Sequence, residues 1–406
     1  MTDLLQLVDT PQQIVAATQR LRAQARREDI PPLRVMEILE RWGEALTGPE
    51  VDSIPGVAFL RLWLRRGTLE PIVARELGSE ALHGKWREER GARLRAFPVG
   101  VVGHWPAGNI EIQPMLSLTC GLLGGNASLV RVPSDLVTEC GALIEKLCQT
   151  DAAGNLTGRI FLAAFGHERT DLHQAMASVV DGAMIWGGAE AVTQIRSLPF
   201  PHWARIAVFG PLLSVAAMDA DSWDSPRERE AWCRRIARDV WQFDQQACSS
   251  AQVLFLERRA GANVQEFVAQ LAEALRAENR VHPRASAHPA MTSAICLSRA
   301  SWLLGNTDRS AVFPPSPDWT ILLGEGADIP TPTQGRTLTV LMVENLLEPI
   351  ARFDGSVQTL GLAVTDTDKE AALTHAAGRC GVDRIVKLGR MHVFGSPWDG
   401  ADVVRP

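Results

Sequence analysis

The sequence predicts an α/β protein built on a doubly wound, largely parallel sheet, with a second α/β domain after it. Two observations lead to this prediction. From Leu94 onward, short apolar runs of strand length alternate with segments of helical periodicity, which is typical of parallel strands joined by crossover helices. The chain also has 406 residues, which exceeds one ordinary core and favours two or three domains.

The first sheet is predicted from apolar runs at residues 97–102, 127–132, 159–165, 183–186, 206–209 and 212–218. The helices between these runs are predicted at residues 110–123, 134–148, 167–178 and 189–197. Sheets of this kind bind nucleotides at the carboxyl ends of their strands. Residues 91–219 are therefore expected to form a nucleotide-binding domain.

The chain before this sheet is expected to be a helical segment over residues 1–90 that packs on the nucleotide-binding domain. Amphipathic patterns over residues 12–27 and 33–46 flank a break at Pro31-Pro32. Their apolar faces need a partner surface, so we expect the neighbouring domain to cover them.

A polar segment from Asp219 to Glu230 marks the crossing into the second domain, which is expected over residues 220–392, with a tail over residues 393–406. Its strands are predicted at residues 253–257, 320–323, 337–343 and 361–364, and its helices at residues 264–278 and 369–378. A polar stretch containing proline and alanine follows the first of these helices.

The composition is that of an ordinary globular protein, with 46% hydrophobic and 22% charged residues. A formal charge of −6 gives no reason to expect nucleic acid, and glutamates balance the arginines of residues 61–66 and 87–95, which we interpret as solvated helix faces. The seven cysteines are odd in number and lack metal-binding spacings, which favours a reducing compartment. Without a signal peptide or an apolar run of membrane length, we expect a cytoplasmic protein that does not insert into membranes.

The candidate nucleophile is Cys248, which follows a helical stripe ending near Trp241 and precedes the apolar run 253–256. A cysteine on a loop between two buried elements is held by a rigid scaffold and can face a cleft, where a thiolate attacks a carbonyl. The alternative is a small buried hydrophobic residue, and for a cysteine taken alone that alternative is the commoner one.

A second informative stretch runs from Phe97 to Asn109, where a strand leads into a loop that carries glycine and proline. Asn109 stands at the predicted start of a helix. Its side chain either caps that helix or donates a hydrogen bond to an oxyanion that develops in the cleft. The two roles need different rotamers.

With these stretches in view, the chain resembles the LuxC-like acyl-CoA reductases, the fatty acyl reductase branch of the aldehyde dehydrogenase superfamily. The resemblance covers about residues 95–400 and rests on several motifs in the family's order. They are Pro106-Ala-Gly-Asn109, Asn126-Ala-Ser-Leu-Val-Arg131, Ile185-Trp-Gly-Gly-Ala-Glu190, Asp244-Gln-Gln-Ala-Cys248, Gln358-Thr-Leu-Gly-Leu-Ala363 and Gly389-Arg-Met391.

This resemblance implies an aldehyde dehydrogenase-like fold, with a Rossmann-type NAD(P)-binding domain and an active site between it and the catalytic domain. It assigns Cys248 as the nucleophile and Asn109 as an oxyanion donor alongside the backbone N–H of Cys248. Gly187, Gly188 and Glu190 match the loop and helix start that border the cofactor's phosphates. A tight strand-to-helix turn is the alternative role for these three residues.

One departure from the superfamily concerns the cofactor. Arg131 stands where a lysine is common near the adenosine ribose, and Ser134 follows where NAD-preferring members often carry a glutamate. Arg131 with Ser134 can accept a 2′-phosphate, whereas a carboxylate would repel it, so NADPH is preferred over NADH. The alternative makes Arg131 a solvated strand end and Ser134 a helix cap.

Another departure concerns water. Hydrolytic members carry a glutamate before a Gly-Gly pair, and the matching residues here, 207–211, contain no carboxylate. Without that base, an acyl-cysteine is expected to persist until it accepts hydride or transfers to another thiol. This absence favours a thioester reductase.

We therefore expect NAD(P)H-dependent reduction of an acyl thioester to an aldehyde through an acyl-Cys248 intermediate. The donor is expected to be acyl-CoA or an acyl-carrier-protein thioester, and the resemblance implies a homo-oligomer. Acyl-phosphate reduction, aldehyde oxidation and a catalytically silent scaffold remain alternatives. His104 and His392 are not assigned acid–base roles, and Asp244 and Gln245 are expected to hold the cysteine loop.

Overall fold

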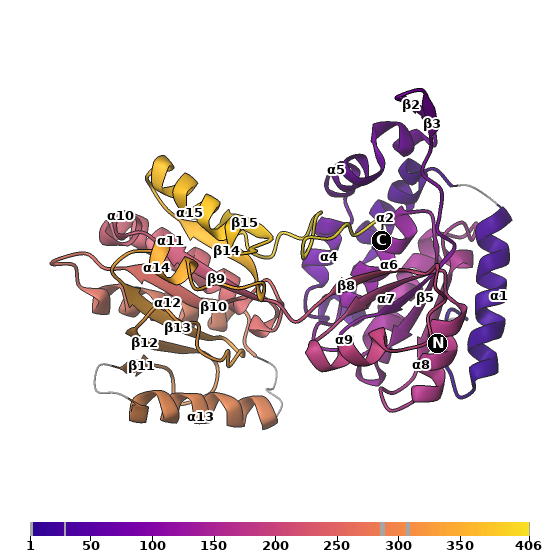
Figure 1. Cartoon of the computed structure of the whole chain (residues 1–406). Coiled ribbons are helices and arrows are strands. Elements are labelled where there is room, and N and C mark those ends of the chain that lie inside the picture. The colour runs from indigo at the N-terminus through magenta and orange to yellow at the C-terminus, as the bar shows by residue number, and fades with distance from the viewer. Residues whose placement is uncertain (1–2, 28–29, 285–288, 306–308, 406) are drawn as a thin grey trace. The chain divides into compact units, whose positions relative to one another are not determined.

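The computed structural model describes residues 3–27, 30–284, 289–305 and 309–405 (Figure 1). The chain divides into two compact units. The first unit comprises Met1–Pro211 with Phe394–Pro406, and the second unit comprises Leu212–Val393. These compact units are divided after Pro211 and after Val393. The domain boundaries predicted at residues 90, 219 and 392 remain predictions.

The first unit contains a six-stranded sheet in the order β1-β6-β5-β4-β7-β8, and every neighbouring pair is parallel. The strands are β1 (Leu5–Leu7), β4 (Val101–Trp105), β5 (Ala127–Val132), β6 (Ile160–Ala164), β7 (Gly182–Trp186) and β8 (Arg205–Phe209). From β4 the chain winds outward through β5 and β6, and then returns to the other side of β4 for β7 and β8. The predicted doubly wound sheet is confirmed, with its switch point between β4 and β7.

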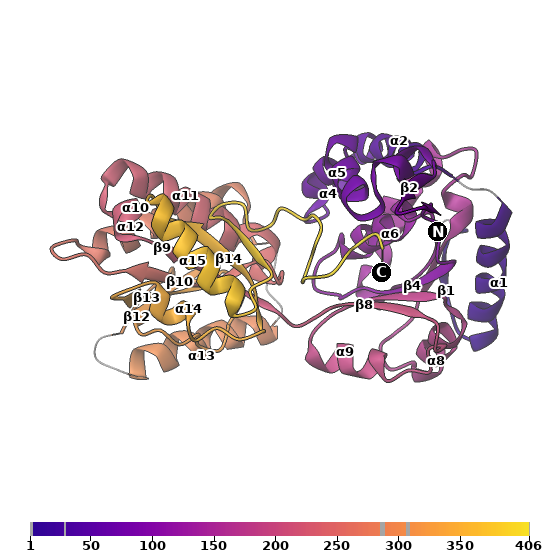
Figure 2. The same cartoon turned by 45° about the horizontal axis from the view of Figure 1, so that its top comes forward.

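Helices cover both faces of this sheet, as Figure 2 shows, with α8 and α9 on one face and α2 and α6 on the other. The crossover helices are α6 (Gln113–Leu123), α7 (Val137–Thr150), α8 (Thr170–Val179) and α9 (Ala189–Arg196). The N-terminal helices are α1 (Pro11–Arg27), α2 (Pro32–Ala45), α3 (Pro49–Asp52), α4 (Val57–Trp63) and α5 (Arg66–Leu77). Trp42 of α2 is fully buried and donates its indole N–H to the carbonyl of Leu143 in α7 at 2.9 Å. Helix α2 therefore packs against the crossover helix α7.

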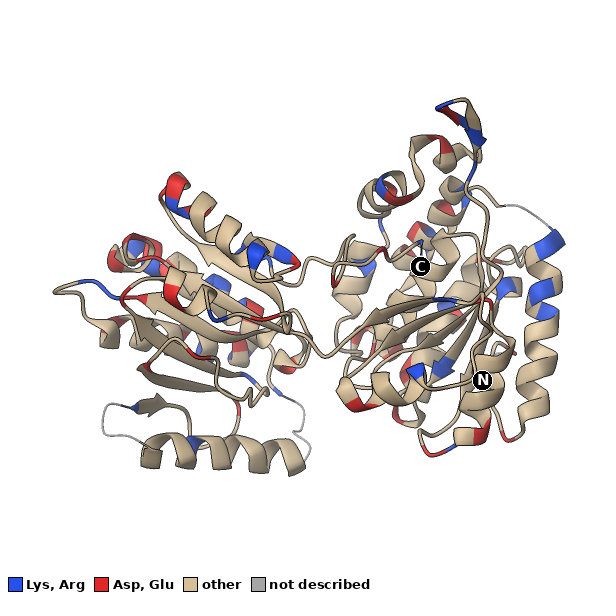
Figure 3. Cartoon of the chain, viewed as in Figure 1, with Lys and Arg blue, Asp and Glu red and all other residues tan. Residues whose placement is uncertain are grey.

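Two segments that were expected to be helical form strands instead. Leu5–Leu7 form the edge strand β1 beside β6, and the arginine-rich stretch forms the hairpin β2 (Arg87–Glu89) and β3 (Ala92–Leu94) instead of a helix face. Arg90 and Gly91 have φ of 48° and 78°, the left-handed pair that a two-residue hairpin turn requires. Figure 3 shows basic and acidic residues mixed on this hairpin, so it presents no surface of one sign.

The second unit contains a seven-stranded sheet in the order β11-β12-β13-β10-β9-β14-β15, parallel except for the β11–β12 pair. Its strands are β9 (Leu213–Met218), β10 (Ala251–Glu257), β11 (Ser310–Val312), β12 (Thr320–Glu325), β13 (Thr337–Val343), β14 (Val357–Ala363) and β15 (Arg384–Lys387). Its helices are α10 (Ala220–Asp224), α11 (Pro226–Trp241), α12 (Val264–Val281), α13 (Pro289–Gly305), α14 (Leu347–Ile350) and α15 (Thr367–Arg379). Helix α13 and strand β11 were not predicted from the sequence.

Strand β10 is the centre of the second unit, because it pairs with β13 on one side and β9 on the other. Leu254 and Leu256 join one core with Phe267 of α12, whereas Val253 and Phe255 join the core on the opposite face. Burial on both faces explains why this strand is a continuous apolar run. Its start is consequently a rigid platform for the loop that precedes it.

Two segments lie in a different unit from the one that their position in the chain suggests. β9, expected in the first sheet, pairs with β10 and β14 of the second. The C-terminal segment returns to the first unit, where the buried carboxylate of Glu76 accepts the backbone N–H groups of Val403, Val404 and Arg405 at 2.8–2.9 Å. Within the described ranges, no helix has the length and apolar character needed to cross a membrane.

Candidate active site

Cys248 lies between the short helix η4 (Gln242–Gln245) and β10, at the amino end of the central strand of the second unit. The residue is half-buried. The Ser214 hydroxyl of β9 donates to the Cys248 carbonyl at 2.6 Å, and the N–H of Ser250 donates to the carbonyl of Ala247 at 2.9 Å. The candidate nucleophile thus stands on a tight turn that is tied to two strands.

The residues before the cysteine hold this turn, as the sequence predicted. The Gln245 amide donates to the carbonyls of Ala251 and Thr337 at 2.7 and 2.9 Å and accepts the N–H of Thr337 at 2.6 Å. Asp244 accepts from Arg336 at 2.6 Å and pairs with Arg284 at 3.1 Å. The Gln245 side chain fills the gap between β10 and β13 that the loop leaves open, which satisfies buried backbone groups.

The backbone before Cys248 is unusual. Phe243, Asp244 and Gln245 have φ of 56°, 51° and 60°, in the left-handed region that non-glycine residues seldom adopt. Such residues cost about 1–3 kcal/mol each and persist only where surrounding contacts determine the conformation. The contacts of Asp244 and Gln245 supply that constraint.

The buried cysteines of the chain are poor nucleophiles because burial keeps their thiols protonated. Burial raises the pKa of Cys140 and of Cys233 to about 12, and it also raises the pKa of Cys120. The thiolate is the reactive form of cysteine, so these three residues are core side chains, as predicted. Cys248 differs from them in being only half-buried, at the amino end of a central strand.

The predicted residues of the first unit gather at the carboxyl edge of its sheet. Asn109 follows β4, Arg131 and Ser134 lie at the end of β5, and Gly187 follows β7. β4 pairs with both β5 and β7. The topology therefore brings together side chains from three segments at the switch point, where doubly wound sheets bind ligands.

Asn109 is not the N-cap residue of α6. Helix α6 begins at Gln113 with Ile112 as its N-cap, and Asn109 lies on the exposed loop before it. The structure therefore contradicts the capping role that the sequence left open. Asn109 and Cys248 belong to different units.

The glycine loop after β7 is open. Gly188 is the N-cap of α9, and a Cβ at this residue would meet no described atom within 4 Å. Glu190 lies exposed in the first turn, where its carboxylate accepts from Gln194 at 3.4 Å. The backbone at Gly188 is thus accessible to a ligand at the helix N-terminus, which fits a phosphate-bearing cofactor.

Arg131 is less available to a phosphate than its position in the sequence suggested. Its Nε–H donates to the carbonyl of Phe165 at 3.3 Å, and burial lowers the pKa of the guanidinium, partly offset by the carboxylates of Glu168 and Asp135. The influence of these two carboxylates was not predicted from the sequence. Ser134 begins a short 3-10 helix and is exposed.

An aromatic and hydroxyl network stands beside the same edge and was not predicted. Trp186, the last residue of β7, stacks on Phe209 with ring centroids 3.8 Å apart and donates its indole N–H to Ser117 at 2.9 Å. His104 contacts Ser117 and Ser128 at 2.8 and 3.2 Å. Complete burial lowers the pKa of His104 to about 3, so this imidazole is a neutral core group.

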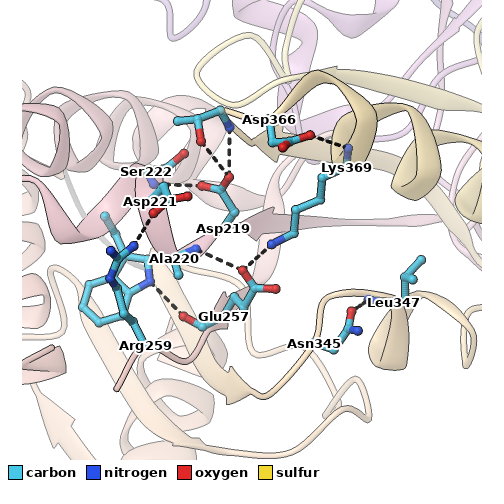
Figure 4. Close-up of polar contacts among 12 residues, drawn as sticks. Asp219, Ala220, Asp221, Ser222, Glu257, Arg259, Asn345, Leu347, Asp366 and Lys369 are labelled. Carbon is cyan, nitrogen blue, oxygen red and sulfur yellow. Dashed lines mark hydrogen bonds and ion pairs between the residues drawn. The ribbon is translucent and has the colours of Figure 1, made fainter. Parts of the chain in front are cut away.

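The carboxyl edge of the second sheet is occupied by its own structural hydrogen bonds (Figure 4). Asp219 accepts from Ser222 and Thr365 at 2.8 and 2.9 Å, and Glu257 accepts from Ala220 and Lys369 at 3.1 and 2.5 Å. These carboxylates cap helices and join β9 and β10 to their neighbours. The candidate nucleophile lies at the opposite, amino end of β10.

A family profile matches this sequence. The LuxC acyl-CoA reductase profile covers residues 40–404, which is most of the chain. The chain belongs to this family. The resemblance seen in the sequence is confirmed by a profile that spans both units.

Curated relatives of the family are similar over most of the chain. The long-chain acyl-protein thioester reductase of Aliivibrio fischeri is 24% identical over 335 residues, which are 81% of this chain and 66% of that protein. The enzyme of the same name from Vibrio harveyi is 24% identical over 361 residues, 88% of this chain and 72% of that protein. The chain thus spans about two thirds of the length of these relatives.

Solved structures share the fold at low identity. The NAD-dependent aldehyde dehydrogenase of Sinorhizobium meliloti has a TM-score of 0.67 at 13% identity and covers 93% of this chain and 79% of its own. A proline utilization A protein of Bradyrhizobium japonicum has a TM-score of 0.70 at 16% identity, with 98% of this chain and 44% of its own covered. The predicted aldehyde dehydrogenase-like fold is confirmed.

Proposed function

We propose that the chain reduces an acyl thioester to an aldehyde through a covalent acyl-Cys248 intermediate. The observation that carries the proposal is the position of Cys248 in a member of the LuxC family, on a constrained turn at the amino end of the central strand. The names of the curated relatives support the same reaction class.

In the proposed reaction, the Cys248 sulfur attacks the thioester carbonyl and the carrier thiolate leaves with the electrons of the broken C–S bond. The Asn109 amide and the Cys248 backbone N–H stabilise the oxyanion. A nicotinamide cofactor, when bound, would supply the hydride that reduces the acyl carbon. The C–S bond to Cys248 then breaks, which releases the aldehyde and regenerates the thiolate.

The first unit supports reduction over hydrolysis. Strand β8, which the sequence aligns with the catalytic glutamate of hydrolytic relatives, consists of Arg205–Phe209 and contains no carboxylate. Water therefore has no base from this strand to activate it against an acyl-cysteine. A persistent acyl-enzyme is the consequence.

The cofactor is proposed to be NADPH or NADH, held at the carboxyl edge of the first sheet. Gly187 and Gly188 admit the pyrophosphate close to the backbone, and Glu190 borders it from the first turn of α9. Arg131 and Ser134 are proposed to meet a 2′-phosphate. Asp135 and Glu168 oppose that contact, so the preference for NADPH rests on the balance between them and Arg131.

Replacement of Arg131 tests this preference. We expect Arg131→Met to lower kcat/KM with NADPH about tenfold, or about 1.4 kcal/mol, because one charge-assisted contact is lost, and to leave NADH within about twofold. The control is Arg205→Met, an exposed arginine at the start of β8. Equal losses with both cofactors would show that Arg131 supports the fold and does not select the cofactor.

The proposed reaction is tested with acyl-CoA and acyl-carrier-protein thioesters of several chain lengths, each with NADPH and with NADH. Intact-protein mass spectrometry without reduced cofactor should find one acyl group on Cys248, and trapping should find the aldehyde once the cofactor is added. Acid formed from free aldehyde would identify an aldehyde dehydrogenase. If no thioester gives either an adduct or an aldehyde, the result favours the catalytically silent scaffold.

The donor is proposed to be acyl-CoA or an acyl group carried on a protein, and the names of the relatives favour the protein-bound form. The β2–β3 hairpin carries mixed charges, which include an Arg87–Glu89 ion pair at 3.2 Å, so it offers no uniformly basic surface to an acidic carrier protein.

We further propose that the protein is a cytoplasmic homo-oligomer.

A further inference from the structure

A buried imidazole lies against the residue that follows Cys248. His392 is 6% exposed, its Nδ1 lies 2.9 Å from the Ser249 hydroxyl, and its Nε2 lies 2.7 Å from the carbonyl oxygen of Asp239. A carbonyl only accepts hydrogen bonds, so the imidazole hydrogen is on Nε2. Nδ1 is therefore the acceptor, and Ser249 donates to it.

The imidazole is itself held by the end of α11. The Asp239 carboxylate accepts the backbone N–H groups of Gly389 and Met391 at 2.5 and 3.4 Å, which ties the segment before His392 to the helix. Gly389 has φ of 88°, and a Cβ there would lie 2.7 Å from the Arg235 side chain. The approach of this segment to α11 therefore needs glycine at residue 389.

We infer that His392 is a positioning residue for the Cys248 nucleophile. The peptide of Cys248 is fixed on one side by Ser214, whose hydroxyl donates to the Cys248 carbonyl at 2.6 Å. On the other side, Ser249 is fixed by His392 at 2.9 Å. These two hydrogen bonds set the backbone that carries the thiol, and hence the direction of its Cβ–Sγ bond. This inference rests on the proposed function only in taking Cys248 as the nucleophile.

The same contacts argue against His392 as an acid or base. Both ring nitrogens are engaged, the ring is buried, and Phe243 packs edge-on against it with centroids 5.5 Å apart. Burial lowers the pKa of His392 to about 4, although the Asp239 carbonyl opposes that shift. The imidazole therefore acts through Ser249, as a neutral acceptor of fixed tautomer.

The test compares His392→Phe, which keeps a ring and removes both hydrogen bonds, with His392→Asn, whose Oδ1 can take the place of Nδ1. With Phe we expect kcat for aldehyde formation to fall about 10- to 100-fold with KM within about twofold, since a misplacement of about 1 Å can cost about 100-fold. With Asn we expect kcat within about threefold of wild type. The control is His375→Phe, an exposed residue of α15.

Ser249→Ala removes the same hydrogen bond from the other partner and serves if His392→Phe does not fold. We expect the double variant, which carries Ser249→Ala and His392→Phe, to be no slower than the slower single variant, because each substitution removes the same Ser249–His392 hydrogen bond. Multiplicative losses, or Asn as slow as Phe, would overturn the inference. Backbone hydrogen exchange of residues 246–250 tests the positioning role separately from the proposed reaction. Exchange that is at least about tenfold faster in His392→Phe but not in His392→Asn supports the positioning role, even if no thioester is reduced. Unchanged exchange in His392→Phe refutes it.

Discussion

Cys248→Ala is expected to abolish the acyl adduct and to lower aldehyde formation by at least about 10⁴-fold, since no other group takes the place of the attacking sulfur. Residual turnover would come from substrate binding and oxyanion stabilisation alone. The measurement is cofactor oxidation and trapped aldehyde with the best thioester of the panel, together with the intact mass of the protein after mixing with that donor.

Matched controls come from two other accessible cysteines of the second unit. Cys296 on α13 is exposed and Cys380 after α15 is half-buried, and both lie away from the loop before β10 in the chain. Replacing either by alanine should leave the rate within about twofold. Full aldehyde formation by Cys248→Ala would show that the reaction does not proceed through acyl-Cys248. Acylation of Cys296 in the wild type would instead identify that residue of α13 as the nucleophile.

Acid is expected to destabilise the first unit far more than the second. Burial lowers the pKa of His104 to about 3 and of His173 to about 4, both in the first unit. Unfolded histidines bind protons below about pH 6.5, whereas these two stay neutral when folded, so stability falls as pH drops. From pH 7.5 to pH 5, the loss should be about 4 kcal/mol for the first unit.

In the second unit two shifts of opposite effect cancel. The pKa of His392 is lowered to about 4, which costs stability as pH drops, whereas burial raises the pKa of Asp239 to about 7. A carboxyl with a raised folded pKa binds its proton between about pH 7 and pH 4 while the unfolded carboxyl does not, so its contribution grows as pH drops. The net change should be within about 1 kcal/mol.

Hydrogen exchange resolved by segment measures both units in one sample. At pH 5, after correction for intrinsic rates, strands β4 to β7 should lose protection relative to pH 7.5, while β9 and β10 should keep it. His104→Gln should remove about half of the loss, and His202→Gln, at an exposed residue, should remove none. Equal losses in both units would contradict the assignment of the shifts to these histidines.

The fold could be predicted from the sequence to a large extent because its signals are local. β5 matches the predicted strand at residues 127–132, and β6, β7, β8 and β9 each lie within about one residue of the predicted runs. Two predicted strands are displaced: β4 spans Val101–Trp105 where residues 97–102 were predicted, and β14 spans Val357–Ala363 where residues 361–364 were predicted. The elements that were missed altogether are short or polar. β1 has three residues, and the hairpin at residues 87–94 was obscured by charges that suit a helix surface equally well. α13 followed a stretch whose prolines and alanines concealed its start.

The candidate site was predictable in its parts and not in its assembly. Cys248 and the glycines after β7 were proposed as site residues from local pattern and family resemblance, and the expectation that Asp244 and Gln245 hold the loop is confirmed. Their partners were out of reach, because Gln245 meets Thr337 and Ser249 meets His392 across 92 and 143 residues of chain. Of the two carboxylates that act on Arg131, Glu168 is also distant in the chain, whereas Asp135 stands only four residues away and was overlooked.

The sequence alone determined the alternation of strands and helices, the cysteine at the start of a buried strand and the absence of a carboxylate in β8. These are encoded in periodicity and residue type over a few neighbours. Only the tertiary structure decided that β9 belongs to the second sheet, that the switch point lies between β4 and β7, and that His392 accepts from Ser249. Strand order and register join residues far apart in the chain, and that pairing depends on how whole sheets pack rather than on any short pattern.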